Sequence, residues 1–201
     1  KDLENPNFLV LISDDQRWDQ LSYSDDPLIP ELKTPNMDNM ASGGVYFRNA
    51  FITTPICAVS RASIMTGRYV STHGMNHFNT PIAPEVLKKS YPAVLHDNGY
   101  KTAVLGKWGM GIEGTEEIFD EFNAWSNQGT YFHETDSGKI HNSEWLAVKS
   151  REFLESCSTD EQPFCLTVCF KAPHHPYQPD KRDKDLFENV VTNLIHFTSL
   201  N

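Results

Sequence analysis

The sequence has few cysteines, no long apolar run and no excess of basic residues, and each absence excludes a class of protein. Four cysteines in 201 residues are too few and too unevenly spaced for a disulfide framework. The longest purely aliphatic stretch, Leu9 to Ile12, is far shorter than the ~20 apolar residues of a membrane-spanning helix. The net charge is −10, from 27 acidic residues against 17 lysines and arginines. This acid excess argues against a nucleic-acid-binding protein, which needs a basic surface.

The composition indicates a folded globular protein. Hydrophobic residues make up 39% of the chain and aromatic residues 11%, more than a disordered chain of this charge carries. A length of 201 residues suits one domain with a substantial core. Cys165 and Cys169 lie four residues apart in a predicted strand, about 13 Å at ~3.3 Å per residue, beyond the reach of a disulfide. We therefore expect free, packed thiols.

Strands and helices alternate along the predicted chain. The strands are residues 8–12 (buried on both faces), 45–52, 101–105 and 164–170. The helices are residues 35–42, 58–66 (ended by Gly67) and 91–98, and a segment capped by Asn142 or Ser143 that runs through Glu155. Residues 114–138 form a polar loop. This alternation predicts an α/β fold, a mostly parallel sheet sandwiched by helices.

The side chains best suited to chemistry follow the predicted strands. Asp14 and Asp15 follow the first strand, Cys57 the second, Lys107 the third and His174 the fourth. Ligands of parallel sheets bind beyond the carboxyl ends of the strands, which lie at one edge. We therefore expect these side chains to surround one site.

Two of these segments suggest ligands, although each has a simpler interpretation. Asp14 and Asp15 offer two carboxylates suited to Mg²⁺ or Ca²⁺, but such a pair also occurs in a solvated turn. Cys57 begins a predicted helix whose free N–H groups favour an anion, and Arg61 lies one helical turn later. A buried cysteine with a surface arginine would explain that pattern equally well.

The remaining candidates are a lysine and a histidine in loops. Lys107 lies in the glycine-rich segment Gly106–Gly111, where its charge suits a tetrahedral anion, but a solvated lysine is the usual case. His174 lies in the stiff turn Pro173–Pro176 and could contact an anion or donate a proton, or be an ordinary loop histidine. His73 and His77 lack a third metal ligand and are interpreted as structural.

Taken together, these segments resemble the type I sulfatases of the alkaline phosphatase superfamily, in order from Phe8 to about Pro179. The matching motifs are the strand ending in Asp14-Asp15, Thr34–Asp38, Gly44–Phe47 with Asn49-Ala50, Cys57–Ser63 with Thr66–Arg68, Gly106–Trp108 and Ala172–His174. The resemblance implies that the parent activity is hydrolysis of sulfate esters, on sugars or glycans. It also implies a periplasmic or secreted location, although no signal peptide and no initiator methionine are visible at Lys1.

The resemblance assigns roles to individual residues. Cys57 would be oxidised to formylglycine by a formylglycine-generating or other sulfatase-maturing enzyme, and the hydrated aldehyde would be the nucleophile. Asp14 and Asp15 would form half of a Ca²⁺ site, with Mg²⁺ as the alternative, and residue 57 would give the metal one hydrate oxygen. Arg61 would orient the hydrate, and Lys107 and His174 would bind sulfate, with His174 assisting departure of the alcohol.

Three features depart from the family pattern. Val59 stands where the family usually carries Pro or Ala, and Gly109 where it usually carries a histidine. The later Asp, Asn (or His) and Lys that complete the family's site have no counterpart, so we interpret the chain as the N-terminal portion of a sulfatase domain. The alternatives are a phosphoester or phosphonate-ester hydrolase of the same superfamily and a non-catalytic, anion-binding fragment.

Overall fold

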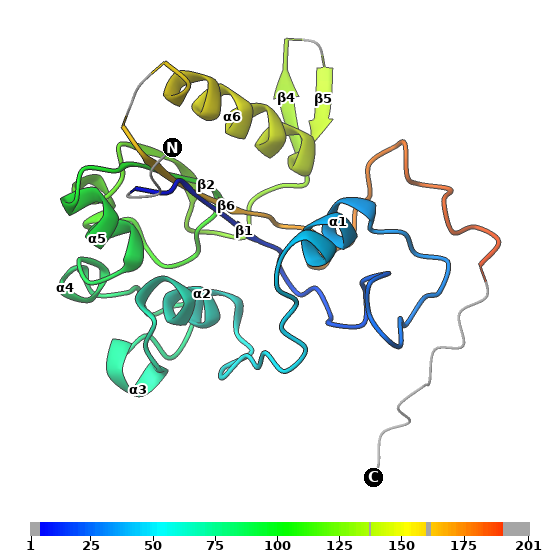
Figure 1. The fold of residues 1–201 in the computed structure, drawn as a ribbon, viewed down its shortest axis with the longest axis horizontal. Coiled ribbons are helices and arrows are strands. Elements are labelled where there is room, and N and C mark those ends of the chain that lie inside the picture. The colour runs from blue at the N-terminus through cyan, green and yellow to red at the C-terminus, as the bar shows by residue number, and fades with distance from the viewer. Residues whose placement is uncertain (1–4, 137, 160–161, 191–201) are drawn as a thin grey trace. The chain divides into compact units, whose positions relative to one another are not determined.

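The computed structural model describes residues 5–136, 138–159 and 162–190, drawn as a ribbon in Figure 1. Its chain divides into two compact units. The larger, here called the sheet unit, consists of Lys1–Asp15 and Phe51–Gln178. The smaller, here called the second unit, consists of Gln16–Ala50 and Pro179–Asn201. All the site residues that the sequence predicts belong to the sheet unit.

The sheet unit is built on a parallel sheet of four strands. In sheet order, the strands are β1 (Phe8–Ile12), β6 (Phe164–Cys169), β2 (Lys101–Lys107) and β3 (Glu121–Trp125). Each neighbouring pair is parallel, so the carboxyl ends of all four strands lie at one edge. The α/β fold and the strands predicted near residues 8–12, 101–105 and 164–170 are confirmed.

Helices cover both faces of this sheet, as Figure 1 shows. One face carries α6 (Asn142–Cys157), and the other carries α2 (Cys57–Thr66), α4 (Pro84–Leu87) and α5 (Tyr91–Asp97), with the short α3 (Val70–His73) after α2. The side chains of β2 alternate between the two cores. Val104 packs in the core beside α2 and α5, whereas Leu105 packs with Leu146 and Phe153 of α6. Burial on both faces explains the continuous apolar run Ala103–Leu105 at the centre of β2.

Strand β1 is less buried than its sequence predicts. Leu9 is 50% exposed and Leu11 46%, so the expectation of burial on both faces is wrong. The reason is its position at the edge of the sheet, where β6 is its single neighbour among the described strands.

The ends of the main helices follow local backbone chemistry. Gly67 ends α2 in the left-handed conformation (φ 63°), and its N–H donates to the carbonyl of Ser63 at 2.9 Å. Helix α6 is capped by His141, whose Nδ1 accepts from the N–H of Ser143 at 3.2 Å, and not by Asn142 or Ser143 as predicted. In the described part of the chain, no helix is both long and apolar enough to cross a membrane.

The segment predicted as a polar loop over residues 114–138 contains regular structure. It holds the 3₁₀ turn Thr115–Glu117, strand β3, and strand β4 (Phe132–Thr135), which pairs antiparallel with β5 (Gly138–His141). The sequence conceals β3 because it is a short edge strand whose apolar residues alternate with Glu121 and Asn123.

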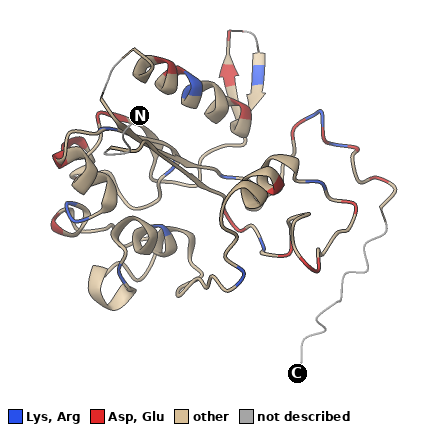
Figure 2. Cartoon of the chain, in the orientation of Figure 1, with Lys and Arg blue, Asp and Glu red and all other residues tan. Residues whose placement is uncertain are grey.

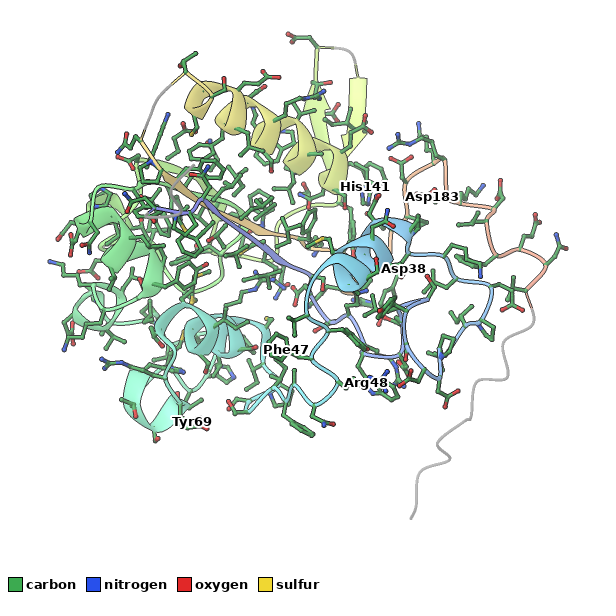
Figure 3. The ribbon with its side chains drawn as sticks, viewed as in Figure 1. Asp38, Phe47, Arg48, Tyr69, His141 and Asp183 are labelled. Carbon is green, nitrogen blue, oxygen red and sulfur yellow. The ribbon has the colours of Figure 1, made fainter. Side chains whose placement is uncertain are left out.

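The second unit confirms one predicted element. Helix α1 (Pro35–Gly43) starts after Thr34 as predicted, but the Thr34 hydroxyl donates to the Asp38 carboxylate at 2.8 Å and caps no backbone N–H. Asp38 and Phe47 are labelled in Figure 3.

The strand predicted over residues 45–52 is wrong. This segment is irregular, and the exposed side chains of Val45 and Phe47 show why. Alternating apolar residues form a strand only where a neighbouring strand supplies hydrogen bonds and a core.

We expect Gly106→Ala to destabilise the protein far more than Gly99→Ala. Both glycines have positive φ (92° and 82°), which costs an alanine about 1–2 kcal/mol, but only at Gly106 would the new Cβ overlap the carbonyl oxygen of Cys169. Urea unfolding should show Gly106→Ala at least about 2 kcal/mol less stable than Gly99→Ala. Equal losses would contradict the close packing of β2 on β6.

Candidate active site

Three strand ends and one helix start converge in the sheet unit. Asp14 follows β1, Lys107 is the last residue of β2, and His174 lies shortly after β6. Cys57 is the first residue of α2 and is reached through an irregular loop, not through the predicted strand. Asp14, Lys107 and His174 therefore follow strand ends at the carboxyl edge of the sheet, as predicted. Cys57 does not, because the strand predicted before it is absent from the structure as described.

Asp14, Arg61 and Lys107 form what we call the buried charge cluster. All three side chains are almost fully buried. One carboxylate oxygen of Asp14, Oδ2, accepts a hydrogen bond from Lys107 Nζ and lies 3.6 Å from Arg61 Nη2. The backbone N–H of Asp14 donates to the carbonyl of Ala172 at 3.2 Å, which ties β1 to the chain after β6.

Arg61 has hydrogen-bonding capacity to spare. Its Nη2 donates to the carbonyl of Phe170 at 3.4 Å, but its Nη1 is buried and has no partner among the described residues. An unpaired buried donor costs about 1–3 kcal/mol, more when it is charged. A bound anion would remove that cost.

Cys57 lies where such an anion could meet it. It is half-buried at the N-terminus of α2, and Arg61 follows four residues later on the same face of the helix. The helix dipole and the first N–H groups of α2 favour negative charge near this position. Cys57 and Arg61 therefore share one face of α2 next to its N-terminus.

His174 and Asp15 form the open side of the site. Asp15 has a positive φ of 59° and its side chain is 57% exposed, with Oδ2 3.7 Å from His174 Nε2. His174 Nδ1 lies against the carbonyl of His175 and must donate to it, since a carbonyl only accepts. Nε2 is therefore the ring nitrogen that faces Asp15. The carbonyl of His174 accepts from the Tyr131 hydroxyl, which fixes this loop.

Lys171 is a buried cation at the same edge that the sequence analysis missed. It is 3% exposed, and its Nζ donates to the carbonyl of Gln128 at 2.9 Å and lies 5.1 Å from the Tyr131 ring centre. Burial lowers the pKa of Lys171, and the positive charge of Lys107 lowers it further. Its position two residues after the buried strand β6 could have identified it from the sequence as a candidate site residue.

Gly109 has a backbone that disfavours the histidine usual in the family. Its φ is 78°, a conformation that strains any side chain with a Cβ. A Cβ there would lie 3.6 Å from that of Ala58, so space alone does not exclude a larger residue. The backbone turn is what favours glycine here.

The carboxylates of the site make an incomplete metal-binding set. Asp14 and Asp15 are two ligands, one of them already paired with Lys107, whereas Ca²⁺ takes 6–8 oxygens. Within the described ranges, no three His, Cys, Asp or Glu side chains gather as a metal site. The described residues therefore do not fit the metal by themselves.

A pocket of about 500 Å³ adjoins His174. Its lining includes Gln128, Tyr131, Phe132, Lys171 and Gln178. The pocket therefore joins the open side of the site to the buried Lys171.

Elsewhere the acidic residues, red in Figure 2, are distributed over helices, loops and the β4–β5 hairpin.

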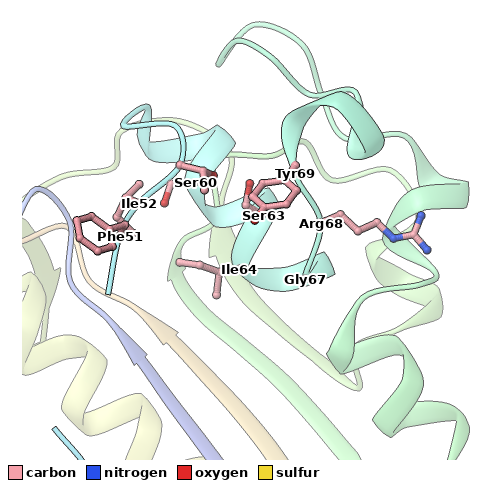
Figure 4. A pocket seen from close by; sticks show the side chains of 9 residues that line it. Phe51, Ile52, Ser60, Ser63, Ile64, Gly67, Arg68 and Tyr69 are labelled. Atoms are coloured by element: carbon pink, nitrogen blue, oxygen red, sulfur yellow. The ribbon is translucent and has the colours of Figure 1, made fainter. Parts of the chain in front are cut away.

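A second pocket, of about 320 Å³, lies beside α2 and includes Ser63, Arg68 and Tyr69 (Figure 4). Ser63 Oγ is 3.0 Å from Nε2 of the buried His73, which resembles a catalytic dyad. However, His73 Nδ1 accepts from the N–H of Met75, so Nε2 carries the proton of the neutral ring and cannot deprotonate Ser63. Burial also lowers the pKa of His73. The pair is structural.

Comparison with known proteins identifies the family. The family model described as Sulfatase matches residues 6–196. The chain belongs to the sulfatase family. An N-acetylglucosamine-6-O-sulfatase of Bacteroides thetaiotaomicron is 28% identical over 95% of this chain and 35% of its own length. An ulvan-active sulfatase of Formosa agariphila is 27% identical over 94% of this chain and 40% of its own.

A solved structure supports the same assignment. BT4656, in complex with its substrate D-glucosamine-2-N,6-O-disulfate, superposes with a TM-score of 0.80 and 28% identity, over 94% of this chain and 38% of that one. This sulfatase chain thus spans between 35% and 40% of the length of these three relatives. The predicted membership of the alkaline phosphatase superfamily is confirmed.

Asp14→Asn should destabilise the sulfatase chain strongly, because it leaves Lys107 and Arg61 buried without their carboxylate. Breaking a buried pair in this way costs about 3–5 kcal/mol. Glu117→Gln is the matched control, since its pair with Lys88 is exposed and worth about 0–1 kcal/mol. Similar losses in urea unfolding would show that the buried charge cluster does not stabilise the fold.

We expect Cys57 to be alkylated before the other thiols in folded protein. Burial raises the pKa of Cys165 to about 11, so at pH 8 only ~0.1% of it is thiolate, the form that reacts. Burial also raises the pKa of Cys169, partly offset by Arg61. Iodoacetamide labelling and peptide mass spectrometry would test the order, with urea-unfolded protein as the control. Labelling of Cys165 as fast as Cys57 would contradict it.

Proposed function

We propose that this sulfatase chain contributes the nucleophile and anion-binding side of a site that hydrolyses sulfate esters of carbohydrates. The observation that carries the proposal is the unpartnered, buried Arg61 Nη1 beside Cys57 and Lys107. The sugar substrate class follows the two relatives and the solved structure, which act on N-acetylglucosamine 6-sulfate groups, ulvan and a disulfated glucosamine.

The proposal gives each side chain a task. When Cys57 is converted to formylglycine, the hydrated aldehyde supplies one hydroxyl for attack on sulfur and a second whose deprotonation releases sulfate. Arg61 orients the group at position 57 and offsets negative charge that develops there. Lys107 binds a sulfate oxygen as a point charge. His174 Nε2 donates the proton that the departing alcohol needs.

We propose that Asp14 and Asp15 supply part of the ligands of a Ca²⁺ site. Their carboxylates are the oxygen donors that Ca²⁺ prefers, but two side chains do not complete its coordination. In the chain as described, Asp14 holds Lys107 in position. By family resemblance, we also propose that a formylglycine-generating or other sulfatase-maturing enzyme acts on Cys57 and that the protein is periplasmic or secreted.

Coexpression with a formylglycine-generating enzyme tests the central step. We expect an aldehyde at position 57, detected by an aminooxy label in the peptide that contains residue 57, and none in Cys57→Ala. Cys57 is only half-buried and is therefore more accessible than Cys165, which is buried and should remain a thiol. An unmodified thiol in every preparation would count against a catalytic role.

Turnover of an aryl sulfate against an aryl phosphate separates a sulfatase from a phosphoester hydrolase. We expect the isolated 201 residues to bind inorganic sulfate but to turn over the aryl ester poorly, because the metal-binding set is incomplete. A rate comparable to that of a longer relative would contradict the second expectation. Absence of sulfate binding would contradict the proposed function itself.

A further inference from the structure

Lys171 occupies the backbone position that connects two members of the buried charge cluster. The carbonyl of Phe170, immediately before it, accepts from Arg61, and the carbonyl of Ala172, immediately after it, accepts from the N–H of Asp14. The chain on both sides of Lys171 is therefore held at the site. Its side chain is 3% exposed, so the ammonium is buried at the carboxyl edge of the sheet.

The charges around Lys171 do not balance. With Lys171 included, three buried cations of the sheet unit (Arg61, Lys107 and Lys171) face one buried carboxylate among its described residues, that of Asp14. The other buried carboxylate, that of Asp19, belongs to the second unit and pairs with Arg17. A buried charge without a partner is costly. Since the excess is positive, the group that offsets it must be an anion.

Lys171 also has donors to spare. Its ammonium has three N–H groups, and the described residues provide one acceptor, the carbonyl of Gln128 at 2.9 Å. Arg61 Nη1 is likewise buried without a partner. Two buried cations with unused donors at the same edge of the sheet match an anion with several oxygens better than a single carboxylate.

The pocket beside His174 shows how an anionic ester could reach Lys171. Lys171 and His174 both line this pocket of about 500 Å³. The reacting group could enter there with its alcohol part in the pocket and its sulfate oxygens toward the charge cluster.

We propose that Lys171 is a third cationic ligand of the reacting sulfate group, beside Arg61 and Lys107. The inference rests on the proposed function and adds a residue to that site. The competing explanation is that Lys171 only anchors the loop at Gln128. The two explanations predict different changes in stability when the charge of Lys171 is removed. Removing a loop anchor lowers the stability of the fold, whereas removing an unbalanced buried cation does not.

Calorimetric titration of the full chain with inorganic sulfate distinguishes them. Lys171→Gln keeps a donor for the Gln128 carbonyl but removes the charge, and we expect sulfate to bind at least about tenfold more weakly. Lys171→Arg should stay within about threefold of the wild type. Lys101→Gln is the matched control, because Lys101 begins β2 at the opposite edge of the sheet and donates to Ser156, and it should bind sulfate unchanged.

Urea unfolding without sulfate provides the second measurement. We expect Lys171→Gln to be as stable as the wild type or more stable. A loss of stability with unchanged sulfate affinity would establish the loop anchor and overturn the proposal. If Lys171→Gln does not fold, ¹⁵N-lysine spectra of the wild type decide the question, with Lys171→Arg assigning the signal. Sulfate should shift the Lys171 Nζ signal and not that of Lys101, and an unshifted Lys171 would overturn the proposal.

The failure of this inference and the failure of the proposed function are distinguishable. If the wild type binds sulfate and Lys171→Gln binds it equally well, only the role of Lys171 is wrong. If the wild type binds no sulfate, the anion site itself is wrong, and the role of Lys171 with it.

Discussion

The site depends on one interaction, the buried pairing of Asp14 with Lys107 and Arg61. These three side chains come from β1, β2 and α2, and each would be costly to bury alone. Their mutual attraction offsets desolvation only when the strands and the helix hold them in close contact. The fold therefore cannot shift these elements relative to one another without exposing or unpairing a charge. That constraint fixes the positions of these three charges at the carboxyl edge of the sheet.

The packing beneath the cluster enforces the same constraint. Gly106, immediately before Lys107, lies against the carbonyl oxygen of Cys169, so that a Cβ there would overlap it. The close approach of β2 to β6 leaves little freedom in the direction of the Lys107 side chain. Phe170 and Ala172, whose carbonyls accept from Arg61 and Asp14, follow within three residues of the end of β6. Backbone geometry, more than side-chain packing, therefore positions the charges.

The sequence predicted what depends on local pattern. Short apolar runs located β1, β2 and β6, and Gly67 marked the end of α2, because burial on a pleated sheet and a left-handed helix end each restrict residue type. The rule that ligands bind at the carboxyl ends of strands then brought Asp14, Lys107 and His174 together. Residues 45–52 and β3 were wrongly predicted because forming a strand depends on a neighbouring strand. Lys171 was missed because its burial depends on contacts with Gln128 and Tyr131, distant in sequence.

The local charge of the site opposes that of the whole chain. The chain carries a net charge of −10, which at long range repels a sulfate ester. Among the side chains of the buried charge cluster and Lys171, cations outnumber carboxylates. The low dielectric around these cations makes their attraction for an anion stronger than that of surface charges, which solvent and salt screen. An anion bound at the proposed site would therefore be held by the short-range effect of a few desolvated donors. Loss of one of those donors would therefore weaken anion binding more than a change in surface charge would, because Arg61, Lys107 and Lys171 are buried.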